Sequence, residues 1–163
     1  MPFRPPGLRY RSTEPGDLTA LGTWLAGAGL GVPEAVKGRS DWSRRLFSDP
    51  HILCRTAVTS TGQIAGFYRL DLAPDRSAEI TLIVAPSRRR KGVGQGLLDH
   101  ALEDARRRGL RYLVAVIQVH NEPARHFFEG AGFAPCDSHL PGYLVLRRLV
   151  HRAAHQEPIE IVP

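Results

Sequence analysis

Residues 84–96 read Val-Ala-Pro-Ser-Arg-Arg-Arg-Lys-Gly-Val-Gly-Gln-Gly. An apolar run precedes this stretch and an amphipathic pattern follows it, so it predicts a strand that ends at Pro86 and a helix that begins near Gly92. The first amides of a helix have no intrahelical partner, and the helix dipole places partial positive charge there. The cations from Arg88 to Lys91 oppose that dipole unless an anion joins them, so we predict a binding site for a phosphate-bearing ligand.

Two common nucleotide-binding loops do not fit this stretch. A Walker loop ends in Gly-Lys-Ser/Thr, whereas here Lys91 precedes Gly92 and Val93 follows it. A Rossmann fingerprint would require glycine at position 97, where this chain has Leu97. The class of the phosphate ligand therefore has to come from the rest of the chain.

Outside this stretch, helix-like and strand-like patterns follow one another in an order typical of a mixed sheet with helices on its faces. We predict one domain over residues 1–150 and a peripheral C-terminal tail over 151–163. Helical spacing covers 17–28, 33–47, 92–108 and a segment that Asn121 caps, and strand-like runs cover 8–11, 52–59, 63–72, 78–84, 112–119 and 143–149.

The formal net charge of +6 raises the question of a nucleic-acid partner. The basic residues concentrate in 88–91 and in 106–108, and the second cluster lies at a predicted helix end, where cations complement the dipole. Glu103 and Asp104 can pair with that cluster four residues on, and we expect both carboxylates on the solvent-facing side. Only Tyr112 stands near the second cluster as an aromatic platform, so we predict no nucleic-acid partner.

Other classes of protein receive no support from the sequence. No apolar run approaches the roughly 20 residues of a membrane helix, and the first ten residues lack the apolar stretch of a secretory signal, so we expect a cytoplasmic protein without a membrane partner. Cys54 and Cys136 have no CxxC partner and are expected to be free thiols. The histidines have no metal-ligand spacing with one another or with the cysteines, so no metal is predicted.

Three short patterns occur in order between Ala78 and Phe133. Val84-Ala85-Pro86 is followed by Arg89-Arg90-Lys91-Gly92-Val93-Gly94, and Asn121, Ala124, Phe127-Phe128 and Gly132-Phe133 come after the next predicted strand. Together they resemble the core of the GNAT superfamily of N-acetyltransferases. Members of that family carry Val-x-Pro, then Arg/Gln-x-x-Gly-x-Gly/Ala, then Asn-x-x-Ala with an aromatic pair and Gly-Phe. The resemblance covers about a third of the chain closely, and the order of elements extends it to nearly all of it.

The resemblance implies a GNAT-like acyl-CoA N-acyltransferase fold, which is an α/β fold of the α+β mixed-sheet type. Its mostly antiparallel sheet splays between two parallel strands, here 78–84 and 112–119, and helices cover both faces. Acetyl-CoA is the implied co-substrate, with its pantetheine arm in the splay. The implied cofactor-binding residues are Leu82, Ile83 and Val84 along the arm, Arg89, Arg90, Lys91, Gly92, Val93, Gly94 and Gln95 around the pyrophosphate, and Asn121 and Phe128 near the thiol.

Glu79 is the catalytic base that the resemblance implies, because many family members place a catalytic glutamate on this strand. Alternation puts Glu79 on one face of the strand with Thr81 and Ile83. The alternative is a structural carboxylate on an edge strand that pairs with a nearby arginine.

The general acid is missing from its usual place. Many family members have a tyrosine at the position of Phe128, which has no proton to donate. Tyr143, His120 and Ser138 are weaker candidates, and the position of His120 at a strand end favours a solvated side chain over a proton relay.

We therefore expect transfer of an acetyl or longer acyl group from acetyl-CoA to a primary amine by direct attack in a ternary complex. The alternative is a catalytically weak or inactive acyl-CoA-binding module. The acceptor is not readable: amino sugars, sugar nucleotides, protein N-termini, lysine side chains, amino acids, polyamines and antibiotics all stay open. Many GNAT members form homodimers, but the sequence contains no interface signature, so the oligomeric state stays open too.

Overall fold

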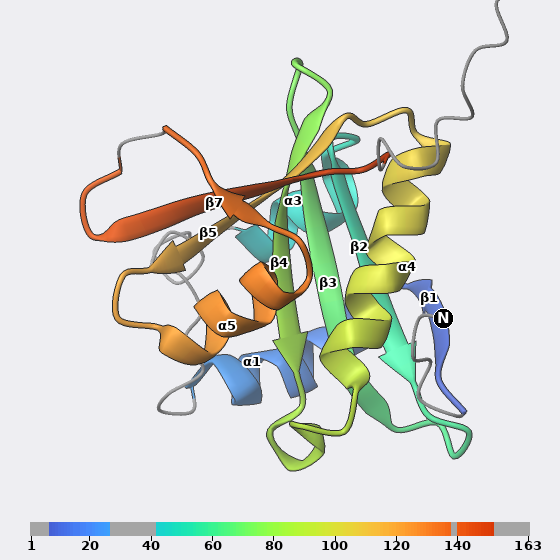
Figure 1. Cartoon of the computed structure of the whole chain (residues 1–163). Helices are drawn as coiled ribbons and strands as arrows, with labels where there is room; N and C mark the ends of the chain where they lie inside the picture. Colours follow the sequence, from blue (N-terminus) through green and yellow to red (C-terminus); the bar gives the residue numbers. More distant parts are fainter. Residues whose placement is uncertain (1–6, 27–41, 138–139, 152–163) are drawn as a thin grey trace, which may run out of the picture.

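The computed structural model describes residues 7–26, 42–137 and 140–151 (Figure 1). In these ranges a mixed sheet carries helices on both faces. The strands are β1 (Arg9–Ser12), β2 (Ile52–Val58), β3 (Ile64–Leu72), β4 (Ser77–Val84), β5 (Tyr112–Gln118), β6 (Ala134–Pro135) and β7 (Tyr143–Leu149). The helices are α1 (Leu18–Ala26), α3 (Trp42–Ser48), α4 (Val93–Arg107) and α5 (Glu122–Gly130), with short 3-10 turns η1 (Pro15–Asp17) and η2 (Pro86–Arg88).

Within the described ranges the sheet has seven strands in the order β1-β2-β3-β4-β5-β7-β6. Every neighbouring pair is antiparallel except β4 and β5, which run parallel. The parallel ladder runs only from Ser77↔Tyr112 to Glu79↔Val114, so the two strands separate beyond Glu79. Figure 1 shows them leaving their shared end in different directions. The sheet is therefore mostly antiparallel and splayed between its two parallel strands, which confirms the predicted fold class.

The two faces of the sheet pack against different helices. The main core joins α4 and α5 to one face and includes Leu97 and Ile80. A smaller core joins α1 and α3 to the other face through Leu21, Leu46 and Ile83. Because side chains alternate along β4, its even-numbered residues face α4 and its odd-numbered residues face α1 and α3. A ligand that enters the splay therefore meets different elements on its two sides.

The helices and strands lie close to their predicted ranges. The second predicted helix, 33–47, is described only at its end, as α3; residues 33–41 and most of the predicted tail, 152–163, lie outside the described residues. Gly109 has a φ of 68° and follows α4, as predicted for a left-handed cap. In the described part of the chain, no helix is long and apolar enough to cross a membrane.

Asp104 corrects the predicted charge pattern of α4. It was expected to face solvent, but it is 5% exposed. The Tyr68 hydroxyl donates to Asp104 Oδ2, and Arg55 Nε donates to the same oxygen at 3.3 Å. The reason is helical spacing: Asp104 stands seven residues after Leu97 and three after Ala101, which places it on the buried stripe. Its neighbour Glu103 does pair with Arg107 at 3.8 Å, as predicted.

The hydrogen bonds around Asp104 define a tautomer of His100. Tyr68 gives its single proton to Asp104, so His100 Nδ1, 2.7 Å from the Tyr68 oxygen, has to be the donor of that second bond. Tyr10 stacks on the His100 ring with 4.4 Å between centroids. Burial, reinforced by the bond to Asp104, raises the pKa of Tyr68. Burial also lowers the pKa of His100, in spite of the opposing effect of Asp104.

This arrangement predicts a loss of stability at mildly acidic pH. Because the folded chain favours neutral His100, the unfolded chain binds the proton first as pH falls below 6.5, and the free energy of unfolding decreases there. A His100→Asn variant keeps an N–H donor but cannot titrate. Chemical denaturation at about pH 7.5 and about pH 5 should show a smaller loss for the variant than for the wild type. Equal losses would contradict the prediction.

Candidate active site

The predicted phosphate loop connects β4 to α4 through η2. Arg90 and Gly92 have positive φ angles of 62° and 81°, so the backbone is left-handed at both residues just before the helix begins. Positive φ is uncommon for a residue with a side chain, and such outliers cluster at binding sites. Gly92 is the N-cap and supplies no side-chain hydrogen bond, and the Gly96 amide is bonded to Gly92 O at 3.0 Å. The amides of residues 93–95 therefore stand at a helix start that its own cap leaves unsatisfied.

The four predicted cations of the loop fall into two groups. Arg89, Arg90 and Lys91 have exposed side chains around the helix start. Arg88 is half-buried and donates to Gln63 Oε1 in the turn between β2 and β3, at 2.5 Å. Three cations are thus placed to attract a polyanion, while the fourth attaches the loop to the neighbouring hairpin.

Two residues of β4 direct their amides into the splay. The Ala85 amide bonds to Ala65 O on β3 at 2.8 Å, and successive amides of a strand point to opposite neighbours. The amides of Val84 and Leu82 therefore point to the β5 side, where the ladder has already ended. Ile83 has the opposite orientation, and its side chain lies in the smaller core. The backbone amides of Leu82 and Val84 therefore face the splay. The Ile83 amide does not.

Gly94 marks where α4, β4 and α5 converge. A methyl group at Gly94 would lie 3.4 Å from the Phe127 ring and 3.6 Å from the Val84 side chain. These are ordinary van der Waals distances, so the first turn of α4 lies one side-chain contact away from both β4 and α5. The side-chain amide of Gln95 lies along the helix, and its Nε2 donates to Asp99 Oδ1 at 2.9 Å.

The downstream motif positions α5. Asn121 caps the helix, and its Oδ1 accepts from the Ala124 amide at 3.2 Å. Phe128 is 7% exposed and packs in the main core, edge to face against Phe127 at 5.2 Å and Phe133 at 5.0 Å between centroids. Phe127, which sequence reasoning did not select, is the aromatic residue that reaches the first turn of α4. Only the packing of α5 against α4 distinguishes the two.

Glu79 lies half-buried on a central strand, at the last residue pair before the splay. Its partner in the antiparallel register is Asp71 on β3, so both carboxylates belong to the face of α1 and α3. Arg69 is on that face too, is 3% exposed, and donates to Asp71 from Nη2 at 2.7 Å and from Nε at 3.0 Å. Sequence reasoning missed Arg69 and Asp71, although their alternation with Phe67 was a signal for two inward charges.

The candidates for a general acid are placed differently. His120 is exposed just beyond β5, in agreement with a solvated strand-end residue. Tyr143 is half-buried at the start of β7 and is paired with Gln118 at the end of β5. Ser138 lies outside the described residues.

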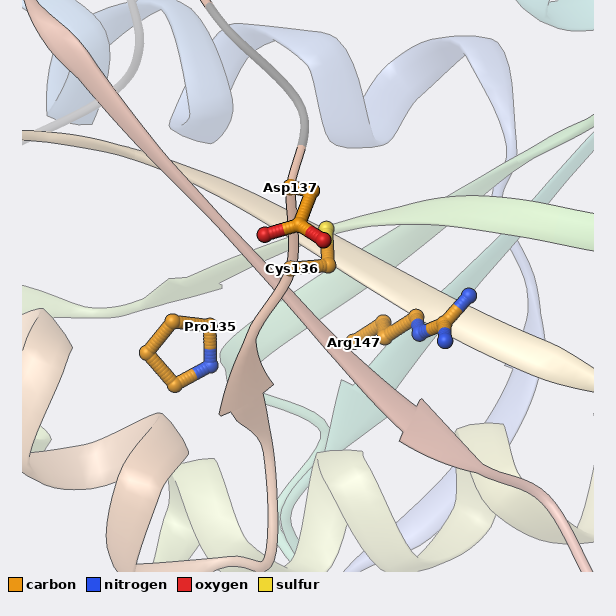
Figure 2. A pocket seen from close by; sticks show the side chains of 4 residues that line it. All are labelled: Pro135, Cys136, Asp137 and Arg147. Carbon is orange, nitrogen blue, oxygen red and sulfur yellow. The ribbon is translucent and has the colours of Figure 1, made fainter.

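A pocket of about 400 Å³ lies at the β6–β7 edge of the sheet (Figure 2). Its Arg147 guanidinium stacks over the Tyr112 ring, 4.7 Å from the centroid. The pocket contains neither Glu79 nor a residue of the phosphate loop, so it is separate from the candidate site. It is lined by Pro135, Cys136, Asp137 and Arg147.

Buried Cys54 does not have the surroundings of a reactive thiolate. Both cysteines are free thiols, and burial raises the pKa of Cys54 to about 12. Cys136 donates to Val145 O at 3.4 Å. Among the residues that the structure describes, no cluster of three His, Cys, Asp or Glu side chains could hold a metal ion.

Two acetyltransferases are similar to this chain in sequence. Streptothricin acetyltransferase of Streptomyces lavendulae is 37% identical over 82 residues, which are 49% of this chain and 43% of that protein. The [ribosomal protein bS18]-alanine N-acetyltransferase of Escherichia coli is 28% identical over 94 residues, 56% of this chain and 64% of that protein. The chain thus spans less than two thirds of the length of either relative.

Solved structures share the fold. Spermidine N-acetyltransferase from Vibrio cholerae, in complex with CoA and spermine, has a TM-score of 0.72 at 20% identity and covers 88% of this chain and 95% of that one. The PaiA N-acetyltransferase from Thermoplasma acidophilum, in complex with coenzyme A, has a TM-score of 0.70 at 19% identity, covering 87% and 98%. The profile of the acetyltransferase (GNAT) family matches residues 24–133, more than half of the sequence. The chain belongs to the acetyltransferase (GNAT) family.

Proposed function

We propose that the protein is an N-acyltransferase that transfers an acetyl group from acetyl-CoA to a primary amine. The observation that carries the proposal is the splay of β4 and β5 beside an uncapped helix start with three exposed cations. A thioester with a diphosphate needs both features, because its charged end requires amides and cations and its arm requires unpaired strand edges. Membership of the family and the CoA complexes of its structural neighbours support the proposal.

The residues present fit this co-substrate. The amides of 93–95, with Arg89, Arg90 and Lys91 around them, would hold the pyrophosphate, and the amides of Leu82 and Val84 would pair with the pantetheine arm. Gly94 leaves the first turn of α4 without a side chain between its backbone and the Phe127 and Val84 side chains. Asn121 contributes by fixing the start of α5, and the Phe127 ring forms a wall against the first turn of α4.

The chemistry follows from the two faces of β4. Acetyl-CoA supplies an acetyl thioester whose carbonyl a neutral amine can attack. The Val84 amide, which points into the splay, would donate to the carbonyl oxygen as negative charge develops there. Glu79, on the face of α1 and α3, would accept the proton that the attacking amine loses, directly or through water. The acceptor thus approaches from the α1 and α3 side. The cytoplasmic location predicted from the sequence suits a CoA-dependent reaction.

The first test is binding of CoA itself. At a hundredfold excess over its Kd, a ligand that binds only the folded state adds about 2.7 kcal/mol to the free energy of unfolding. For a chain of this size that corresponds to a rise of roughly 5–11 °C in Tm. A triple change of Arg89, Arg90 and Lys91 to Gln should shrink this rise. The matched control changes Arg106, Arg107 and Arg108 to Gln, at the other end of α4, and should leave it unchanged. The absence of a rise in the wild type would refute the proposal.

One observation favours the alternative of a binding module without catalysis. Phe128 occupies the place of the usual tyrosine acid and has no proton to give to a leaving thiolate. It is also buried among other aromatic rings. A thiolate is a tolerable leaving group, which is why we place the enzyme first. A thiol-release assay with acetyl-CoA and a panel of amines decides between them. Stabilisation by CoA together with no thiol release from any amine would support the binding module.

A further inference from the structure

Three charged side chains lie on the sheet face that carries the smaller core. Arg69 and Asp71 on β3 and Glu79 on β4 share the face that carries the smaller core, beside Phe67 and Ile83. Arg69 is 3% exposed, and the burial of a guanidinium costs free energy unless a carboxylate compensates it. A hydrophobic residue would serve a purely structural role here at lower cost, so the charges call for a functional explanation.

The register places the two carboxylates directly opposite each other. Asp71 pairs with Glu79, and side chains in such a pair have Cβ atoms about 4.5–5.5 Å apart. Two like charges at this separation repel each other. Arg69 lies two residues from Asp71 and grips both of its carboxylate oxygens, at 2.7 Å and 3.0 Å. Its positive charge offsets the repulsion.

We propose that Arg69 is a positioning residue for catalysis, which binds both carboxylate oxygens of Asp71 and so offsets the negative charge that Asp71 places opposite Glu79, the proposed proton acceptor. This inference rests on the proposed function, because it presumes that Glu79 is the base. Arg69 itself touches neither substrate in this scheme. It acts through Asp71, and Asp71 acts on the charge state of Glu79.

Another charged pair shares this face: Arg11 binds both carboxylate oxygens of Asp17, which also accepts from Thr56, the β2 partner of Phe67. On β5 the neighbour of Glu79 is Val114, and Tyr112 lies two residues before it. Beyond β5, Arg147 of β7 is paired with Val114 and is turned onto the Tyr112 ring. On α3, Arg45 pairs with Asp49 at 3.0 Å. Arg69 is therefore the buried cation closest in register to the two carboxylates in the described part of the chain.

The proposal predicts opposite shifts for its two partners. In Arg69→Gln, the facing carboxylates share a proton to higher pH, so the acid limb of the kcat/KM profile for acetyl transfer should move up by roughly one pH unit. At pH values below that limb, kcat/KM of the variant is then about tenfold lower than that of the wild type, and at high pH the two values are equal. In Asp71→Asn, Arg69 acts on Glu79 alone, and the limb should move down. Arg69→Gln/Asp71→Asn should lie near the wild type, and Arg69→Lys should keep the wild-type limb.

The control separates a structural role from this one. Arg11→Gln breaks another two-point Arg–Asp pair, in which Nη1 and Nη2 contact Asp17 at 2.8 Å and 3.0 Å, and should lower Tm without moving the limb. If Arg69→Gln does not fold, Asp71→Asn and Arg69→Lys still carry the test. Shifts of the same sign for Arg69→Gln and Asp71→Asn, or an unmoved limb in both, would overturn the inference. If Glu79→Gln retains full activity, the base assignment fails first, which distinguishes the two failures.

Discussion

Replacement of Glu79 by Gln is expected to lower kcat for acetyl transfer by about 10²- to 10⁴-fold at neutral pH, which is the usual contribution of a positioned general base. Gln fills nearly the same volume but cannot accept a proton from the attacking amine. The change lies on the face of α1 and α3, while the phosphate loop is built from α4 and its preceding turn. The rise in Tm with CoA should therefore match that of the wild type.

Steady-state thiol release and thermal shift with CoA measure the two quantities on the same protein. Glu129→Gln is the matched control, because Glu129 is an exposed carboxylate on α5 that pairs with Arg125 at 3.3 Å. Its kcat should stay within a factor of two or so of the wild type, as for most surface substitutions. An equally mild effect of Glu79→Gln would remove Glu79 from the mechanism. The search for the base would then turn to groups that reach the splay through water.

The phosphate loop was predictable because its signals are local. Pro86 ends a strand, the spaced glycines open a helix, and cations gather at the helix start, so each property belongs to neighbouring residues. The alternation that places Glu79 on one face of β4 is local too. Tertiary packing does not change such local properties. The structure shows the loop between β4 and α4, where the sequence predicted it.

The features that were missed depend on tertiary packing. The splay itself was predicted, but from the family resemblance, because no pattern in β4 or β5 shows that their pairing ends at Glu79. The choice between Phe127 and Phe128 as the neighbour of Gly94 depends on the rotation of α5 against α4. The helical spacing of Asp104 places it on the buried stripe of α4, but the prediction followed its charge and put it on the solvent-facing side. Charged residues are buried only when partners exist, and Tyr68 and Arg55 come from other elements.

Removal of Asp104 should cause a large loss of stability. Asp104→Ala leaves the fully buried Tyr68 hydroxyl without its acceptor and Arg55 without its counter-charge. Loss of one partner of a buried ion pair costs about 3–5 kcal/mol, and the Arg55 side chain keeps 23% exposure, so we expect about 3 kcal/mol. For a chain of this size the expected fall in Tm is roughly 6–12 °C.

The same experiment tests whether charge or hydrogen bonding dominates in this cluster. Asp104→Asn keeps an oxygen that can accept from Tyr68 but loses the charge that Arg55 faces, so it should fall between the wild type and Asp104→Ala. Glu103→Ala, one residue earlier on α4 and 41% exposed, is the matched control and should change the free energy of unfolding by less than about 0.5 kcal/mol. If Asp104→Ala is as mild as Glu103→Ala, water must replace the lost carboxylate, and the cluster is less closed than its burial indicates. A full loss in Asp104→Asn as well would show that Arg55 depends on the charge itself. Asp104 lies in the C-terminal part of α4, away from the phosphate loop at the N-terminus of that helix. Retained CoA binding in a folded variant would therefore confirm that Asp104 serves to hold α4 on the sheet.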